Sequence, residues 1–264
     1  MKVAVIKLPY RTVFLEPLGD FHVGNPGFDE EKLRERIRAI KRQRNRFTIG
    51  MGDYAEWIYP SPGGITDKRW SPQHVRRDLL TRSDQYDYVV KLLRPLKGKV
   101  LGLLSGNHEW VIEDYTGIEL TRYLAEELEA EYLGAAGLIQ LWLKGLDDPI
   151  VIAATHGSYA GRTLGGAMNR LNSWAKGFDA DIYLMGHTHW RHVWEGDEKI
   201  TVSRDGKLIR YHPVKALTGS FLHGYVQGGD SYVERKALPP RKIGTITVKI
   251  EIDDEGNVKL RGYQ

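Results

Sequence analysis

Short apolar runs alternate with amphipathic stretches along most of this chain, and this alternation limits the possible folds more than any other feature. A run over 14–18 precedes a helix predicted over 29–44, and a run over 47–51 precedes a helix predicted over 73–93. Strand–helix–strand units place helices on the faces of a sheet. After position 190 only short alternating stretches follow, separated by turn residues. The pattern therefore predicts two packed sheets with helices outside.

The predicted helix over 29–44 shows the local signals most clearly. Asp29 is placed to cap it, and Leu33, Ile37 and Ile40 form an apolar stripe at spacings of four and three. Further helices are predicted over 110–132 and 162–176. Further strands are predicted over 100–104, 139–143, 150–155, 182–185, 191–194, 200–203, 208–212, 243–250 and 258–262.

Several classes of protein are excluded by what the 264 residues lack. There is no cysteine, which rules out disulfides, thiolate metal sites and a cysteine nucleophile. No apolar run approaches the roughly 18 residues that span a bilayer, and Lys7 interrupts the N-terminal apolar stretch before it could act as a secretory signal. We therefore expect a cytoplasmic protein without membrane association. No repeat or linker divides the sequence, so we expect one domain over 1–264.

Five short polar clusters carry the chemistry, and each follows a predicted strand. They are Gly19-Asp20-Phe21-His22, Gly52-Asp53, Gly106-Asn107-His108-Glu109, Thr155-His156-Gly157 and Gly186-His187-Thr188-His189. Strand ends in such folds converge on one edge, so these side chains can meet there. Alternate residues of an extended segment also point the same way, which suits the Asp-x-His and His-x-His spacings. A single such residue would usually be structural, but five clusters in this order point to a site.

The donor atoms in these clusters suit a divalent transition metal. Two carboxylates, one amide oxygen and four imidazoles form a set of oxygen and nitrogen ligands fit for Mn, Fe, Zn or Ni. The formal net charge of +4 permits an acidic partner such as a phosphate but does not require one.

The ordered series resembles the motifs of the calcineurin-like metallophosphoesterase superfamily, which run Asp-x-His, Gly-Asp, Gly-Asn-His-Asp/Glu, His and Gly-His-x-His. The resemblance covers Asp20 to His189. It implies a four-layer α/β/β/α sandwich of two mixed sheets flanked by helices, with two metal ions, Mn foremost. By motif position, one ion is expected at Asp20, His22 and His189, and the other at Asn107, His156 and His187, with Asp53 bridging both.

The resemblance also implies roles in catalysis. Two cations roughly 3.5–4 Å apart acidify a bridging water and clamp the oxygens of an in-line phosphoryl displacement. A bridging residue between two cations must be an anion with two oxygens, as Asp53 is. His108 matches the superfamily's general acid. Glu56 stands three residues after Asp53, where the pattern often has the carboxylate that orients this histidine. Glu109 is interpreted as structural.

Departures from subfamily patterns favour a phosphodiester substrate, nucleotide-like or another small diester. Trp57 stands where the protein phosphatases of the superfamily have an arginine that clamps a terminal phosphate, and the absence of that clamp argues against a phosphomonoesterase without excluding it. The Gly-His-Thr-His motif resembles the phosphodiesterase and nuclease branches.

A nuclease and a non-catalytic interaction scaffold also stay open as interpretations. The insertion over 54–104 mixes aromatic and cationic residues, namely Trp57, Tyr59, Lys68, Arg69, Trp70, Arg76 and Arg77. They could bind single-stranded DNA or RNA, as in a nuclease, or the tryptophans could plug the loop while the arginines face solvent. The stretch over 225–241 could be a lid or a surface hairpin. Retention of every ligand position argues against the scaffold. The oligomeric state is left open.

Overall fold

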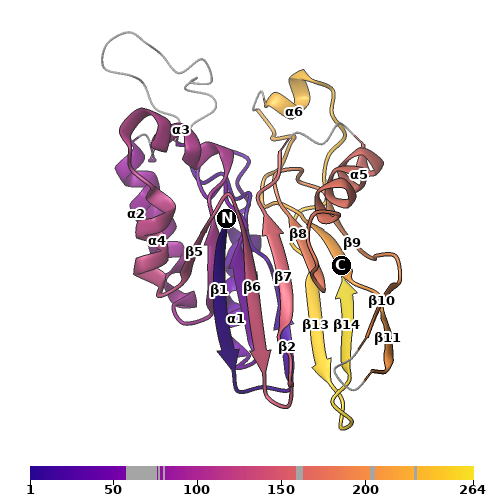
Figure 1. Cartoon of the computed structure of the whole chain (residues 1–264). Coiled ribbons are helices and arrows are strands. Elements are labelled where there is room, and N and C mark those ends of the chain that lie inside the picture. Colours follow the sequence, from indigo (N-terminus) through magenta and orange to yellow (C-terminus); the bar gives the residue numbers. More distant parts are fainter. Residues whose placement is uncertain (58–75, 77, 80, 159–162, 203–205, 229–230) are drawn as a thin grey trace.

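The computed structural model describes residues 1–57, 76, 78–79, 81–158, 163–202, 206–228 and 231–264, and within them two sheets of six strands pack face to face (Figure 1). In spatial order, the first sheet is β1 (Lys2–Leu8), β6 (Ala136–Leu143), β7 (Ile150–Thr155), β8 (Ile182–Met185), β12 (Val214–Thr218) and β9 (Arg191–Glu195). The second is β14 (Val258–Tyr263), β13 (Thr247–Ile252), β2 (Thr12–Leu15), β3 (Arg46–Gly50), β4 (Val100–Leu104) and β5 (Glu131–Gly134). A separate hairpin pairs β10 (Lys199–Val202) with β11 (Leu208–Tyr211).

Both sheets are mixed, and each has a run of parallel strands that includes its middle. In the second sheet β2, β3, β4 and β5 are parallel, and in the first β7, β8 and β12 are parallel. The main buried cluster takes side chains from both sheets, among them Ile49, Leu104, Ile139 and Ile152. These central strands are short apolar runs because both of their faces are buried.

Helices cover the outer faces of the two sheets. On the second sheet lie α1 (Glu30–Arg42), α2 (Arg82–Leu93) and α4 (Leu120–Leu128), joined in one buried cluster with residues of β4. On the first sheet lies α5 (Leu164–Ala175), packed on Ala153, Tyr183 and Leu217. The predicted four-layer sandwich is therefore confirmed. The expected start of α1 is also confirmed, because the Asp29 side chain accepts a hydrogen bond from the Lys32 N–H.

The single helix predicted over 110–132 is wrong. The chain forms α3 (Asn107–Thr116), then α4, then the edge strand β5. Gly117 ends α3 with φ of 70°, a left-handed conformation that glycine adopts without strain. The sequence pattern also failed to predict β1, β5 and β12, whose strand conformation is stabilised by pairing with neighbouring strands.

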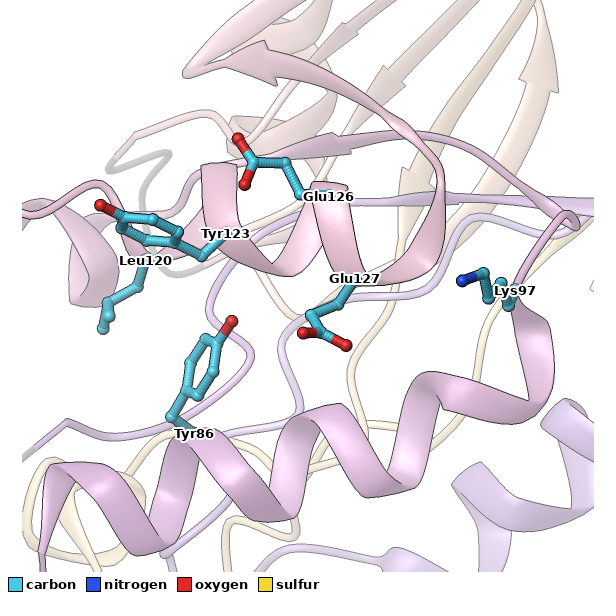
Figure 2. A pocket seen from close by; sticks show the side chains of 6 residues that line it. All are labelled: Tyr86, Lys97, Leu120, Tyr123, Glu126 and Glu127. Atoms are coloured by element: carbon cyan, nitrogen blue, oxygen red, sulfur yellow. The ribbon is translucent and has the colours of Figure 1, made fainter.

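The remaining elements are a short 3-10 turn (Arg94–Leu96) and α6 (Tyr232–Arg235). A surface cavity of about 500 Å³ lies between α2 and α4 (Figure 2). It is lined by Tyr86, Lys97, Leu120, Tyr123, Glu126 and Glu127, none of which belongs to the five clusters. Among the residues that the structure describes, no helix is both long and apolar enough to cross a membrane.

Candidate metal centre

The five clusters meet where β2, β3, β4, β7 and β8 end. Backbone hydrogen bonds join the loops, since the Asp20 N–H donates to Gly52 O and the His22 N–H donates to Asp53 O. Two glycines allow the loops to approach closely. A Cβ on Gly52 would lie 2.6 Å from the Gly106 nitrogen, and a Cβ on Gly106 would lie 2.2 Å from Asp53 Oδ1. Any side chain at either position would push the loops apart.

One group of donor atoms is made by Asp20, His22 and His189. The Nε2 atoms of His22 and His189 lie 3.2 Å apart, and His189 Nε2 lies 3.3 Å from Asp20 Oδ1. Asp20 also accepts the backbone N–H of His187 at 3.1 Å. The structure thus brings together the three residues expected to hold one ion.

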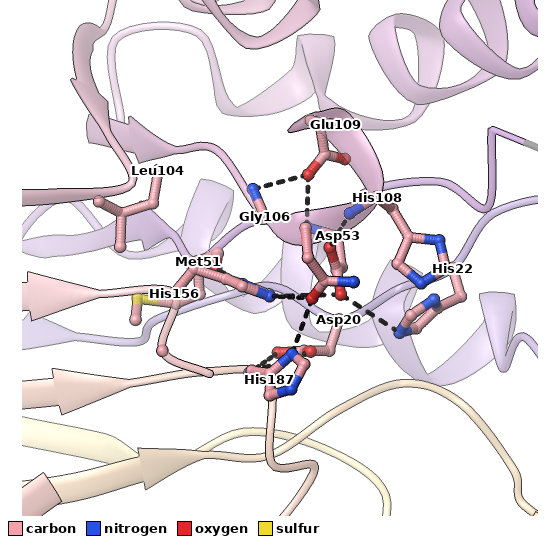
Figure 3. A network of polar contacts seen from close by, with 12 residues as sticks. Asp20, His22, Met51, Asp53, Leu104, Gly106, His108, Glu109, His156 and His187 are labelled. Carbon is pink, nitrogen blue, oxygen red and sulfur yellow. Dashed lines mark hydrogen bonds and ion pairs between the residues drawn. The ribbon is translucent and has the colours of Figure 1, made fainter. Parts of the chain in front are cut away.

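A second group is made by Asn107, His156 and His187 with Asp53. Asn107 Oδ1 lies 3.0 Å from His156 Nε2 and 2.7 Å from His187 Nδ1. The opposite nitrogen of His156, Nδ1, lies 2.7 Å from Met51 O, and that contact fixes the orientation of the ring. Figure 3 shows His156 and His187 beside Asp53.

Asp53 stands between the two groups, as expected of a bridging residue. Its Oδ2 lies 3.3 Å from His156 Nε2 and 4.0 Å from His22 Nε2. Its Oδ1 accepts the backbone N–H of His108 at 2.9 Å, at the first turn of α3. Asp53 is 2% exposed, so this carboxylate can serve only the groups that surround it.

The backbone at these positions is strained. Among the described non-glycine residues, eight have positive φ, and five of them are Asp20, His22, Asp53, His187 and His189, with φ between 50° and 62°. A left-handed conformation costs an ordinary residue about 1–2 kcal/mol. Such strain persists where the surrounding structure determines it, and it is common at functional sites.

The charges of the site act strongly on one another. Burial by itself lowers the pKa of His156, but Asp53, Asp20 and the Met51 carbonyl together outweigh burial and raise that pKa to about 10. Burial likewise lowers the pKa of His22, while Glu56 and two aspartates raise it to about 9. Burial raises the pKa of Asp53, yet the nearby histidines hold it well below its ordinary value. The same imidazoles that a proton occupies here are the candidate metal ligands, so metal binding would release protons.

His108 and Glu56 lie beside the first group of donors. His108 Nδ1 is 3.0 Å from the backbone carbonyl of Glu56 and 3.5 Å from its Oε2. The other carboxylate oxygen, Oε1, lies 3.3 Å from His22 Nδ1. Burial opposes ionisation of Glu56, but His108 and His22 outweigh it and lower its pKa to about 2. The pairing expected between Glu56 and His108 is therefore present, with His22 as a second partner.

Glu109 lies beneath the site and holds its loops. Its Oε2 accepts the backbone N–H groups of Asp53 and Gly106, and its Oε1 accepts the N–H groups of Tyr54 and the Trp57 indole, all at 2.8–2.9 Å. This fits the structural role that the sequence suggested. Trp57 is 3% exposed, so it plugs the interior and is not available to stack on a base.

The donor set fits divalent metal ions on its chemistry. Carboxylate, amide and imidazole atoms converge from five loops, and the groups around Asp20 and Asp53 each place their donor atoms within 4.8 Å of one another. Oxygen and imidazole nitrogen donors gathered in this way suit borderline divalent cations.

The remaining polar residues that the sequence singled out are occupied or lie outside the described part. Tyr59, Lys68, Arg69, Trp70 and Arg77 are outside the described residues. The Arg76 guanidinium pairs with Asp78 and Glu30. Two histidines outside the five clusters also have partners, since His223 pairs with Asp29 and His192 stacks on Trp194.

The stretch over 225–241, described except for 229–230, contains α6. Figure 1 places α6 at the same end of the molecule as α3, whose first turn carries Asn107 and His108. The guanidinium of Arg241 lies over the ring of Trp190, the residue after His189, at 3.6 Å from the ring centre. This stretch therefore lies next to one loop of the site.

Sequence reasoning missed Asn25 and the Met51 carbonyl. Asn25 donates to Glu56 Oε1 at 2.8 Å, and its only signal was the turn sequence Asn25-Pro26-Gly27 directly after the first motif. A backbone carbonyl such as that of Met51 leaves no signal in the sequence.

Comparisons with known proteins agree with this geometry. A family model described as calcineurin-like phosphoesterase matches residues 18–191. No curated protein sequence matches the chain. A Vps29 double mutant from Entamoeba histolytica is similar at 16% identity over 95% of this chain and 98% of that one, with a TM-score of 0.42.

Two further solved structures are similar. One is an uncharacterized protein from Streptococcus pneumoniae described as a predicted phosphoesterase, with 15% identity over 96% and 97% of the two chains and a TM-score of 0.39. The other is a metallophosphoesterase from Sphaerobacter thermophilus, with 13% identity over 96% and 88% and a TM-score of 0.38. Because these identities and TM-scores are low, only the family match bears on what this chain is.

Proposed function

Since this chain belongs to the calcineurin-like phosphoesterase family, we propose that it hydrolyses phosphodiesters, nucleotide-like or otherwise small, with the help of two divalent metal ions. The observation that carries the proposal is the convergence of seven donor residues at one site, with Asp53 between the other six. In this proposal Asp20, His22 and His189 hold one ion, Asn107, His156 and His187 hold the other, and Asp53 contacts both.

The bound ions, with Mn as the first candidate, would supply a nucleophile at neutral pH and offset the charge of the phosphate. The chain itself contributes the rest. Asp53 is fixed by the His108 N–H, and its own N–H is fixed by Glu109. His108 is the proposed general acid. As an acid His108 needs a proton on both ring nitrogens: the Nδ1–H points to the Glu56 carbonyl, and the Nε2–H is the proton that would go to the leaving oxygen.

The preference for a diester is supported by Trp57. In the protein phosphatases that the second motif resembles, the corresponding residue is an arginine that clamps the terminal phosphate. Here the indole is buried and donates to Glu109, so this position offers no cation to a substrate. A diester carries one negative charge fewer than a monoester dianion and depends less on such a clamp.

The test compares metal-stripped protein with protein to which Mn²⁺, Fe²⁺, Zn²⁺ or Ni²⁺ is returned. The substrates are bis-p-nitrophenyl phosphate, p-nitrophenyl phosphate, cyclic and linear nucleotides and single-stranded DNA. We expect turnover only with metal and faster hydrolysis of the diester than of the monoester. Asp53→Asn should abolish both metal binding and turnover.

Each contrary outcome has a defined meaning. If none of these substrates is hydrolysed with any of these metals, the proposed enzymatic activity is refuted, and the non-catalytic interaction scaffold becomes the favoured interpretation. Faster hydrolysis of p-nitrophenyl phosphate would replace the diesterase with a monoesterase. Cleavage of single-stranded DNA that falls steeply with salt would point to the nuclease.

A further inference from the structure

Asn25 lies in the loop that follows His22 and is tied down on three sides. Its backbone N–H donates to His22 O at 2.9 Å, and its side-chain Oδ1 accepts the Gly27 N–H at 2.8 Å. Its side-chain Nδ2 donates to Glu56 Oε1 at 2.8 Å. With both ends of its amide engaged, Asn25 cannot rotate without breaking a hydrogen bond.

The Glu56 carboxylate held by this amide stands between two imidazoles. Oε1 faces His22 Nδ1 at 3.3 Å, and Oε2 faces His108 Nδ1 at 3.5 Å. The rings of these two histidines are in edge contact, with their centres 4.8 Å apart. Glu56 is 5% exposed, and the Asn25 amide donates to the same oxygen, Oε1, that faces His22.

We propose that Asn25 is a positioning residue of the metal centre. By fixing the Glu56 carboxylate, it orients a candidate metal ligand, His22, and the candidate general acid, His108, at the same time. Its effect on turnover rests on the proposed function, while its effect on metal affinity does not.

The physical basis is the orientation of ligands by their outer partners. Groups that hydrogen-bond the far nitrogen of a ligating histidine fix its ring, and their removal typically weakens metal affinity or activity by 10–100-fold. Asn25→Ala leaves Glu56 Oε1 without its donor, so the carboxylate can turn away from both rings. We expect Mn²⁺ to bind about tenfold more weakly to this variant.

Asn25→Asp separates positioning from a merely structural role. Aspartate keeps the oxygen that accepts the Gly27 N–H, so the turn is preserved. It also replaces the donor to Glu56 with a second carboxylate oxygen. While both carboxylates are ionised they repel each other, which weakens the hold of Glu56 on its histidines. A shared proton would restore a donor to Glu56, so the titration is run at pH 8, where the ionised pair is favoured. If Asn25 is a positioning residue, Mn²⁺ affinity should fall from wild type to Asn25→Ala and again to Asn25→Asp. If Asn25 only stabilises the turn, the affinity of Asn25→Asp should be close to that of wild type.

The measurement is calorimetric titration of metal-stripped protein with Mn²⁺, with urea unfolding to verify that each variant is folded. Asn45→Ala is the matched control, because Asn45 Nδ2 also makes one bond of 2.8 Å, to Thr12 O, far from the site. It should bind Mn²⁺ as wild type does. In a Glu56→Ala background, adding Asn25→Ala should change the affinity less than twofold, because Asn25 acts through Glu56.

Two results would overturn the proposal: an Asn25→Asp variant with wild-type affinity, or an effect of Asn25→Ala that persists fully without Glu56. A wild-type protein that binds Mn²⁺ but hydrolyses no ester would refute the proposed function while the order of affinities still decided the role of Asn25. If hydrolysis is observed, the same order is expected in kcat.

Discussion

Glu109→Gln is the substitution that best tests how the loops of the site are held. The carboxylate accepts four N–H groups, two on each oxygen. Glutamine has nearly the same shape but replaces one oxygen with an NH₂ group. Whichever way the amide turns, two buried N–H donors then face another donor. Either Asp53 and Gly106 lose their acceptor, or Tyr54 and Trp57 do.

The magnitude follows from those two lost acceptors. A hydrogen bond to a charged group contributes about 1.5–3 kcal/mol, which gives roughly 3–6 kcal/mol for two. One effect acts in the opposite direction: burial and the nearby charge of Asp53 raise the pKa of Glu109, so a neutral amide relieves some repulsion. We therefore expect a loss near the lower end, about 3 kcal/mol. That corresponds to roughly 6–12 °C in melting temperature.

The assay is urea unfolding of the metal-stripped protein, so that lost metal binding does not add to the effect. Glu113→Gln is the matched control, since it makes the same change one turn later on α3 at a partly exposed position, and it should shift the free energy of unfolding by less than about 0.5 kcal/mol. A loss below about 1 kcal/mol for Glu109→Gln would refute the view that this carboxylate holds the loops.

Two further substitutions test the site directly. Gly106→Ala places a Cβ 2.2 Å from Asp53 Oδ1 without left-handed strain, so titration should show Mn²⁺ affinity reduced more than tenfold. Gly165→Ala is the control, because a Cβ there meets nothing within 4 Å, and its Mn²⁺ affinity should be unchanged. Equal affinities for both variants would contradict the steric argument. His108→Ala should slow hydrolysis of alkyl esters far more than of nitrophenyl esters, because poor leaving groups need an acid; a uniform loss across a series of leaving groups would argue against that role.

The sequence was sufficient to predict that the clusters meet, because the ends of parallel strands converge and each cluster follows an apolar run. Asp20, Asn107 and His187 lie far apart along the chain, yet their loops join at one edge. The cap at Asp29 was predictable for a similar reason, since it depends on residues only three positions away.

The features that could not be predicted from the sequence depend on contacts between distant segments or on a single backbone conformation. One oxygen of the Glu56 carboxylate faces His22 and the other faces His108. This arrangement depends on the relative positions of three loops, which the spacing of residues along the sequence does not determine. The break in the helix predicted over 110–132 was missed because the prediction rested on helical periodicity alone, whereas Gly117 adopts a left-handed conformation that ends α3. The strand β12 was missed because its conformation is imposed by its neighbours β8 and β9.

The left-handed backbone at five donor residues bears on how such a protein can change over evolution. Glycine would adopt the positive φ of each of these positions with less strain. A mutation to glycine there would therefore relieve backbone strain while it removes a candidate metal ligand. Stability and metal binding thus favour different residues at the same five positions. In a lineage that is not selected for metal binding, replacement of these residues by glycine would be expected to cost little stability.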